Sequence, residues 1–182
     1  AGAAGVLPAV LVGMESFGEA DDERLVDAML VAGGIGGVIA QRASLAGAEG
    51  GCQAETGTAA AMSAAAVAWL HGGTNEQVAT AVALTLQGML GLICDPIGGL
   101  VEIPCIYRNA SAAMQAIAGA EMALAGLDFP VSADEVIDVM GEVGRRMPSA
   151  YRETAMGGLA ATASARKLVQ IRPTSRPSGA SR

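Results

Sequence analysis

The sequence is poor in aromatic, lysine and histidine residues, and each shortage narrows the chemistry open to it. Phe, Trp and Tyr make up 3% of the 182 residues, while small residues are abundant, so helices can pack with their backbones close together. The one lysine, Lys167, lies in a basic segment near the C-terminus. A buried lysine that forms a Schiff base with pyridoxal phosphate is therefore not expected.

The one histidine, His71, precedes a Gly-Gly pair. This position is typical of a helix C-terminus, where a cationic side chain is favourable. A Ser-His-Asp site would have to use His71, and the sequence around it contains no nucleophile elbow. The sequence also lacks a G-x-x-x-x-G-K-[ST] motif, and the "GGIGG" segment at 33–37 follows an expected helix instead of a strand. We therefore expect neither a hydrolase triad nor a phosphate-binding loop.

Acidic charge predominates, and the basic charge is concentrated near the C-terminus. The net charge is −7, yet residues 166–182 contain five basic residues and no acidic one: Arg166, Lys167, Arg172, Arg176 and Arg182. The rest of the chain is thus strongly acidic, which argues against a nucleic-acid partner. We expect one helical domain over 1–165, with 166–182 as a disordered basic tail.

Hydrophobic residues make up 52% of the chain, and the run 77–94 carries no charge. Gln, Thr and Gly residues interrupt this run and no basic cluster flanks it, so we do not expect a transmembrane helix. The three cysteines are an odd number, and no signal-peptide pattern precedes them. A secreted disulfide scaffold is therefore not expected, and the reducing cytoplasm is the expected location.

Helical periodicity and capping patterns predict an all-α fold with few or no strands. Capping-box patterns begin at Thr74 and Ser132, the Gly33-Gly34 pair predicts a helix end, and Asn109 predicts a helix start. The central helices should be Ala- and Gly-rich, because two segments are apolar on nearly all sides. We expect a compact bundle of about seven to eight helices, near residues 3–16 with a bend at Pro8, 22–32, 34–43, 53–70, 76–92, 110–125, 133–146 and 150–158, with 53–70 and 76–92 in the centre.

The three cysteines each lie at an expected junction between a loop and a helix. Cys52 follows a Gly-rich segment, and Cys94 and Cys105 flank a Pro-Gly-Gly loop. Helix N-termini and loop amides stabilise thiolates and donate hydrogen bonds to sulfur, as metal or cluster ligands require. Neither spacing is a C-x-x-C motif, so the pattern alone leaves three alternatives: cysteines that merely pack, a zinc site that includes His71, and an iron–sulfur cluster.

Three segments carry a resemblance to a known family. "GAEGGCQAE" at 47–55, "CDPIGGLVEIPCIYRNA" at 94–110 and "YRETAMGGLA" at 151–160 resemble the iron–sulfur L-serine dehydratases, in the C-terminal part of their α chain or α domain. The resemblance runs from Ala1 to about Arg166. It implies a lyase of amino-acid degradation and gluconeogenesis that removes water from L-serine to give pyruvate and ammonia.

The resemblance also implies the cofactor and the partners. In that family three cysteines in these contexts hold a 4Fe-4S cluster whose fourth iron binds the substrate, and the corresponding ligands here are Cys52, Cys94 and Cys105. It further implies a homo- or hetero-oligomer with a β domain or β chain. A related lyase that acts on cysteine or another amino acid is an alternative, as is a non-enzymatic helical or membrane bundle of small residues.

Four further motif residues are charged, and Glu55 and Arg108 each admit two interpretations. Glu49 and Glu55 are either groups that orient the cluster ligands or, for Glu55, an ordinary acid in the first turn of a helix. Arg108 either pairs with the substrate carboxylate or neutralises the acidic chain. Arg152 stands where the family often has lysine, which keeps the positive charge and changes its geometry.

Two features of the family are absent from this sequence. One is a serine-rich S-S-S-H-T-like motif whose histidine is a suggested base, and the other is a final cysteine that can cap the open iron in some relatives. This sequence ends instead in Ser181-Arg182. We therefore expect the catalytic base to lie in a missing N-terminal portion, and the sequence identifies neither the base nor the residues that bind the substrate.

Overall fold

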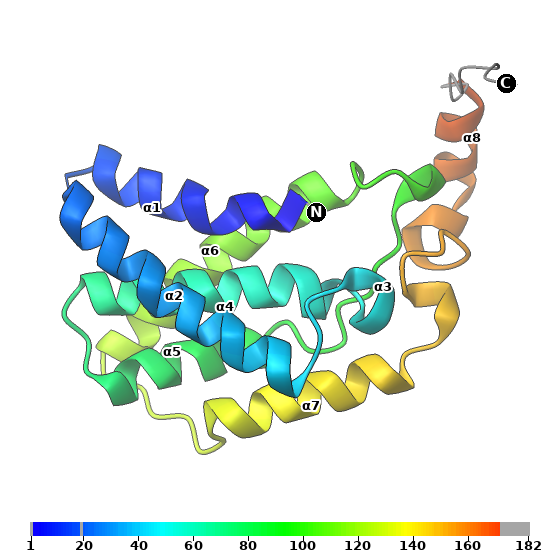
Figure 1. Cartoon of the computed structure of the whole chain (residues 1–182). Coiled ribbons are helices and arrows are strands. Elements are labelled where there is room, and N and C mark those ends of the chain that lie inside the picture. Colours follow the sequence, from blue (N-terminus) through cyan, green and yellow to red (C-terminus); the bar gives the residue numbers. More distant parts are fainter. Residues whose placement is uncertain (1, 19, 172–182) are drawn as a thin grey trace, which may run out of the picture.

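The computed structural model describes residues 2–18 and 20–171, and over these residues the chain is a bundle of α-helices (Figure 1). The α-helices are α1 (Val6–Ser16), α2 (Asp22–Arg42), α3 (Gly47–Gly50), α4 (Cys52–Leu70), α5 (Asn75–Gln87), α6 (Cys105–Leu124), α7 (Ala133–Arg146) and α8 (Ala163–Ile171). Four 3-10 turns lie at Gly2–Gly5, Ile97–Gly99, Ser149–Tyr151 and Gly158–Ala161. The expected all-α fold is confirmed.

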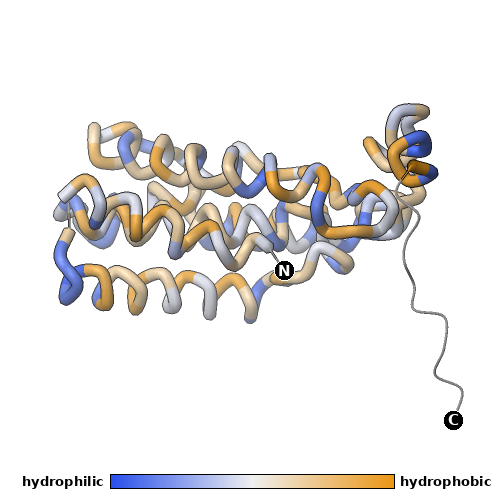
Figure 2. The backbone as a smooth tube through the Cα atoms, turned by 90° about the horizontal axis from the view of Figure 1, so that it is seen from above, coloured by the Kyte–Doolittle hydropathy of each residue, from blue (hydrophilic) through white to orange (hydrophobic). Residues whose placement is uncertain are grey.

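Helix α4 is the centre of the bundle. Ala61, Ala64, Ala66 and Ala68 have no exposed surface. Ala64 and Ala66 lie roughly 200° apart around the helix axis, so even opposite sides of this helix are covered. Helices α2, α5 and α6 pack directly against it. Short side chains all round the helix allow its neighbours to approach closely, as the composition predicted. Figure 2 shows hydrophobic residues along most of the bundle and α8 set apart at one end.

Close packing between α5 and α6 depends on Gly119. A Cβ atom built on Gly119 would overlap the Thr85 hydroxyl and lie 3.2 Å from the carbonyl oxygen of Ala81. On α2, by contrast, a Cβ atom on Gly33 would meet nothing within 4 Å. Gly119 therefore allows α5 and α6 to pack closely, whereas Gly33 has no packing role.

We predict opposite effects for the same substitution at these two positions. Gly119→Ala should lower the free energy of unfolding by about 2 kcal/mol, because the added methyl group forces α5 and α6 apart. Gly33→Ala should raise it by about 0.5–1 kcal/mol, since alanine favours the helical backbone. Urea denaturation of both variants measures these changes. A stabilising Gly119→Ala substitution would contradict the packing between α5 and α6.

The predicted helix end at Gly33-Gly34 was wrong. Helix α2 continues without interruption from Asp22 to Arg42, in place of the two helices expected at 22–32 and 34–43. A glycine inside a helix costs only about 1 kcal/mol relative to alanine. Packing against α4, where Gly36 lies over the Met62 side chain, outweighs that cost.

The helix boundaries around the cysteine loop also differ from the prediction. Helix α5 ends at Gln87, and α6 begins at Cys105, so Asn109 lies inside α6 and does not cap it. Pro104 precedes the first residue of α6. Proline at the start of a helix needs no hydrogen-bond acceptor for its nitrogen, and this was the start signal that sequence analysis missed.

The helix expected at 150–158 is absent, and a helix beyond it was not expected. The segment forms the 3-10 turn Ser149–Tyr151 and then a loop in which Glu153 and Ala155 have positive φ angles of 64° and 57°. The predicted boundary of the basic tail at 166 falls inside α8, and residues 172–182 of that tail lie outside the described residues. Helix α1 starts at Val6 and contains Pro8 in its first turn, where proline is tolerated.

No helix among residues 2–18 and 20–171 is both long enough and apolar enough to cross a bilayer. The uncharged run 77–94 is divided, because α5 ends before a turn at 88–91.

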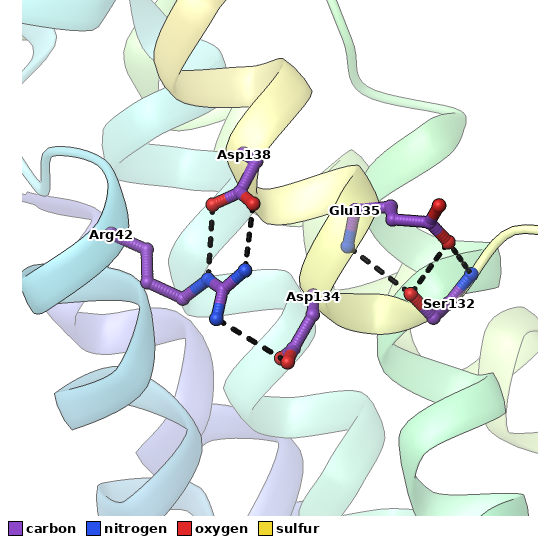
Figure 3. Close-up of polar contacts among 5 residues, drawn as sticks. All are labelled: Arg42, Ser132, Asp134, Glu135 and Asp138. Carbon is purple, nitrogen blue, oxygen red and sulfur yellow. Dashed lines mark hydrogen bonds and ion pairs between the residues drawn. The ribbon is translucent and has the colours of Figure 1, made fainter.

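Both predicted capping boxes are present, and the one at Ser132 begins α7 (Figure 3). The Ser132 hydroxyl accepts a hydrogen bond from the Glu135 backbone N–H at 3.3 Å, and the Glu135 carboxylate accepts one from the Ser132 backbone N–H at 3.0 Å. Beside this box, Arg42 at the end of α2 binds Asp134 and Asp138 of α7. These contacts fix the N-terminal half of α7 against α2.

We predict that Ser132→Ala lowers the free energy of unfolding by about 1 kcal/mol. Ser164→Ala, at an exposed position in α8, is the control and should change it by less than about 0.5 kcal/mol. Hydrogen bonds from Ser132 lower the pKa of Glu135 from 4.5, so their contribution is present above pH 4.5 and is lost as the pH falls through the folded-state pKa. Denaturation at several pH values should show the difference between wild type and Ser132→Ala shrinking below pH 4.5. A constant difference would contradict the role of the carboxylate.

Candidate functional site

The three cysteines meet at one end of the bundle. Cys52 is the first residue of α4, Cys105 is the first residue of α6, and Cys94 lies in the connection between α5 and α6. The thiols of Cys52 and Cys94 form a hydrogen bond. A charge on Cys105 raises the pKa of Cys94, and a charge on Cys52 raises the pKa of Cys105, so all three thiols lie close enough to interact. Residues predicted as one ligand set are thus brought together from three separate segments.

The start of α4 is held by its neighbours on two sides. The backbone N–H of Gln53 donates to the Leu92 carbonyl at 2.9 Å, and the buried Gln53 side chain accepts from the Gly91 N–H and donates to the Met140 carbonyl. Gly51 has a φ angle of 76°, and a Cβ atom there would lie 2.8 Å from the Leu92 carbonyl oxygen. A glycine is therefore required before Cys52, and the position of the Cys52 side chain is well defined.

The backbone of Cys94 is fixed by a segment that is distant in the sequence. Its N–H donates to the Tyr151 carbonyl at 2.8 Å, and its carbonyl accepts from the Glu153 N–H at 2.8 Å. These bonds form the isolated bridge between Cys94 and Arg152. The third motif, 151–160, therefore supports the second cysteine through its main chain, which the sequence alone did not indicate.

A buried ion pair lies beside the cysteines. The Asp95 side chain is 1% exposed, and its Oδ1 atom accepts a hydrogen bond of 2.6 Å from Nη1 of Arg108. The same Nη1 atom lies 3.7 Å from the Cys52 sulfur and 2.8 Å from the Ile93 carbonyl oxygen. The guanidinium also borders an open hollow of about 500 Å³, whose lining includes Ser111 and Gln115. Sequence analysis overlooked Asp95, although an acid directly after a motif cysteine was a visible signal.

These contacts make the three thiols unequal. The hydrogen bond from Cys94, followed by the contact with Arg108, lowers the pKa of Cys52 to about 7. Donation to Cys52 and burial both raise the pKa of Cys94, and burial together with the charge on Cys52 raises that of Cys105. Of the three thiols, Cys52 is therefore the one that ionises most readily. The thiolate is the form that binds metals.

Of the two candidate glutamates, only Glu55 lies at this site. A Cβ atom built on Gly47 would lie 3.0 Å from Glu55 Oε2 and 3.1 Å from the Cys94 sulfur, so both groups lie next to the same point. The charge of Glu55 also raises the pKa of Cys52 and Cys105. Glu49 instead accepts a hydrogen bond from Ser44 at 2.6 Å and faces a hollow between α3 and α7.

The zinc site that included His71 was a wrong alternative. His71 lies at the C-terminal end of α4 and pairs with Glu121 at 3.5 Å, as a helix-end histidine can. Cys52 begins the same helix, and a helix of that length separates the two residues by roughly 28 Å. Within the described part of the chain, no three His, Cys, Asp or Glu side chains are arranged to hold a metal ion.

The donor set fits an iron–sulfur cluster in its chemistry. Three unpaired cysteines lie together, two of them at helix N-termini, and a guanidinium contacts the one that ionises most readily. The ligand sulfurs of a four-iron cluster lie roughly 6 Å apart, which is wider than the spacing around a single ion. Binding would therefore require the hydrogen bond between Cys52 and Cys94 to break.

The chain is similar to known proteins over most of its length. Residues 1–160 match the family model described as serine dehydratase alpha chain. The chain is 50% identical over 168 residues to a probable L-serine dehydratase, alpha chain, of Bacillus subtilis, a match that covers 92% of this chain and 56% of that protein. It is 48% identical over 168 residues to the L-serine dehydratase, alpha chain, of Peptoniphilus asaccharolyticus, with 92% and 58% covered.

The L-serine dehydratase 1 of Escherichia coli is 46% identical over 161 residues, which is 87% of this chain and 36% of that protein. The chain thus spans little more than half the length of the two alpha chains, and a smaller share of the Escherichia coli protein. The family match extends over all three cysteines and the supporting segment up to residue 160. The chain therefore belongs to the serine dehydratase alpha chain family.

Proposed function

We propose that this chain is the cluster-binding part of an L-serine dehydratase. The observation that carries the proposal is the meeting of Cys52, Cys94 and Cys105 at one end of the bundle, in a chain that belongs to this family. These residues would give three thiolates to a 4Fe-4S cluster, without pyridoxal phosphate. When bound, the cluster supplies an iron with an open position, which acts as a Lewis acid on the hydroxyl group of the substrate.

The proposed reaction removes a proton from Cα of L-serine and hydroxide from Cβ. The resulting enamine becomes an imine and is hydrolysed to pyruvate and ammonia. In this chain the three thiolates would hold the cluster, and Arg108 would supply positive charge beside Cys52. Glu55 and Glu153 are both carboxylates near Cys94, and His71 lies at the opposite end of α4.

The activity is proposed for a longer protein, because this chain covers little more than half of the matched alpha chains. We assign the catalytic base and the remaining substrate contacts to the rest of that protein, together with a β domain or β chain in an oligomer. The three free cysteines suit the reducing cytoplasm, where a cluster can be assembled.

Anaerobic reconstitution of the chain with iron and sulfide tests the proposal. About four iron and four sulfide ions should remain per chain after desalting, with the absorption and electron paramagnetic resonance spectra of a four-iron cluster. The same protein incubated with zinc alone is the comparison. Retention of zinc together with failure to retain iron and sulfide would refute the cluster.

The identity of the amino acid is tested separately. A related lyase that acts on cysteine or another amino acid uses the same elimination, with a different leaving group. The complete protein should therefore be assayed with L-serine, L-threonine and L-cysteine. Serine should give the highest kcat/KM, and a higher value for cysteine would assign the chain to the related lyase.

A further inference from the structure

We infer that Asp95 and Arg108 are a positioning pair, which fixes the Cys52 sulfur and couples it to the backbone at Leu159. This inference rests on the proposed function, because it gives the pair a role toward a cluster that Cys52 helps to hold. Neither residue is assigned such a role by the family match. The assignment comes from a chain of contacts that joins three segments of the protein.

Asp95 is the centre of this chain of contacts. Both of its carboxylate oxygens are occupied, since Oδ1 accepts from Nη1 of Arg108 and Oδ2 accepts from the Leu159 backbone N–H, each at 2.6 Å. The residue is 1% exposed, so water cannot replace either partner easily. Loss of one partner would leave a buried charge only half satisfied, which is strongly unfavourable.

Arg108 extends the contacts to the cysteine. Its Nη1 atom has two hydrogens and three acceptors: Asp95 at 2.6 Å, the Ile93 carbonyl at 2.8 Å and the Cys52 sulfur at 3.7 Å. The side chain is 17% exposed and comes from the first turn of α6, one turn after Cys105. Its direction is set by Asp95 and Ile93, so the donor that faces Cys52 has little freedom to turn away.

Stability alone does not account for this pair. A buried ion pair can often be replaced by apolar residues without loss of stability, because removing the charges from water is costly. The exposed pair of Arg42 and Asp138 already shows how this fold joins helices with the same two residue types at its surface (Figure 3). What distinguishes the buried pair is its contact with a sulfur. A donor beside a ligand sulfur orients the ligand and tunes the bound metal.

The hydrogen bond between the Leu159 N–H and Asp95 depends on a glycine. Gly158 has a φ angle of 60°, and a Cβ atom there would overlap the Asp95 carboxylate. The backbone can reach Asp95 only because this residue has no side chain. The motif "YRETAMGGLA" at 151–160 therefore contacts the site twice, once at Cys94 through Tyr151 and Glu153 and once at Asp95 through Leu159.

The experiment compares Arg108→Met, Arg108→Lys and Asp95→Asn in the reconstituted full chain. Removing the guanidinium should make the reduction potential of the cluster more negative, because a positive donor beside a sulfur favours the reduced form. Iron should also be released to a chelator about 10- to 100-fold faster. Arg108→Lys keeps the charge and should fall between wild type and Arg108→Met in both measurements.

The matched controls are Arg42→Met and Asp138→Asn, which remove the same groups from the exposed pair between α2 and α7. Both should keep the wild-type potential and the wild-type rate of iron release. The inference is overturned if Arg108→Met folds and binds the cluster with the potential, spectrum and release rate of wild type. If Arg108→Met does not fold, an unchanged potential in both Arg108→Lys and Asp95→Asn overturns it equally.

A measurement without the cluster separates this inference from the proposed function. In the iron-free chain, hydrogen–deuterium exchange at the Leu159 amide should be at least 10-fold faster in Arg108→Met than in wild type, because Asp95 loses the partner that holds it. If wild type takes up no cluster, the proposed function fails and this exchange rate still tests the pair. Unchanged exchange at Leu159 would contradict the coupling.

Discussion

Replacement of any one of Cys52, Cys94 and Cys105 by serine should abolish stable cluster binding in the reconstituted chain. Iron retained after desalting should fall from about four to fewer than one per chain, because two thiolates do not hold a four-iron cluster against exchange. Serine is close to cysteine in size, so the buried positions of Cys52 and Cys94 should remain filled. Iron and sulfide analysis measures the loss, and circular dichroism verifies that each variant keeps its helices.

The control for the cysteine variants is His71→Ala. His71 is the one histidine of the chain and lies at the far end of α4 from Cys52, so the variant should retain the full iron content. A cysteine variant that keeps the cluster would remove that residue from the ligand set. Loss of the cluster in His71→Ala, with the helices intact, would contradict the position of the site.

The second large effect concerns turnover. The reconstituted chain alone should form pyruvate from L-serine about 10²- to 10⁴-fold more slowly than the same chain supplied with the remaining part of the family's protein. Loss of a general base typically lowers the rate of a reaction by about this factor. Within this chain Glu55 lies next to the cysteines, whereas His71 is too distant to take a proton there. Pyruvate assays with and without the complementary portion, at equal cluster content, measure the ratio.

Full turnover by the chain alone would contradict the assignment of the base to another segment. Glu55→Gln then becomes the decisive variant, because the Glu55 carboxylate lies beside Cys94 and its charge acts on Cys52 and Cys105. A normal rate for the isolated chain that is lost in Glu55→Gln would identify the base. Glu49→Gln is the matched control, since Glu49 faces the hollow between α3 and α7.

Much of the fold was predictable because its signals are local. Two capping boxes and the uninterrupted small-residue pattern of α4 depend on residues within one helix, and all three were found as expected. The errors in the predicted helix boundaries arose where contacts between residues far apart in the sequence determine the local structure. Packing on α4 carries α2 through Gly33-Gly34, and bonds to Cys94 keep 151–153 from forming a helix. Local propensity contains neither effect.

The candidate site shows the same division. The cysteines and Glu55 could be selected from motifs, because their chemistry is evident from residue type. Asp95 could not be assigned a role, since one of its partners, Leu159, is 64 residues away along the chain. The sequence also could not predict that Glu55 lies at the site and Glu49 does not. The two residues are close in sequence, and the turn between α3 and α4 directs their side chains to different places.

The support that residues 151–159 give to Cys94 and Asp95 has a consequence during protein synthesis. At about 5–20 residues per second, a ribosome needs roughly 5–20 s to proceed from Cys52 to Leu159. Throughout that interval the nascent chain presents its first cysteine, and later all three, without the segment that completes their surroundings. The surroundings of the proposed cluster would therefore be complete only after translation has passed this point, when residues 151–159 can support Cys94 and Asp95.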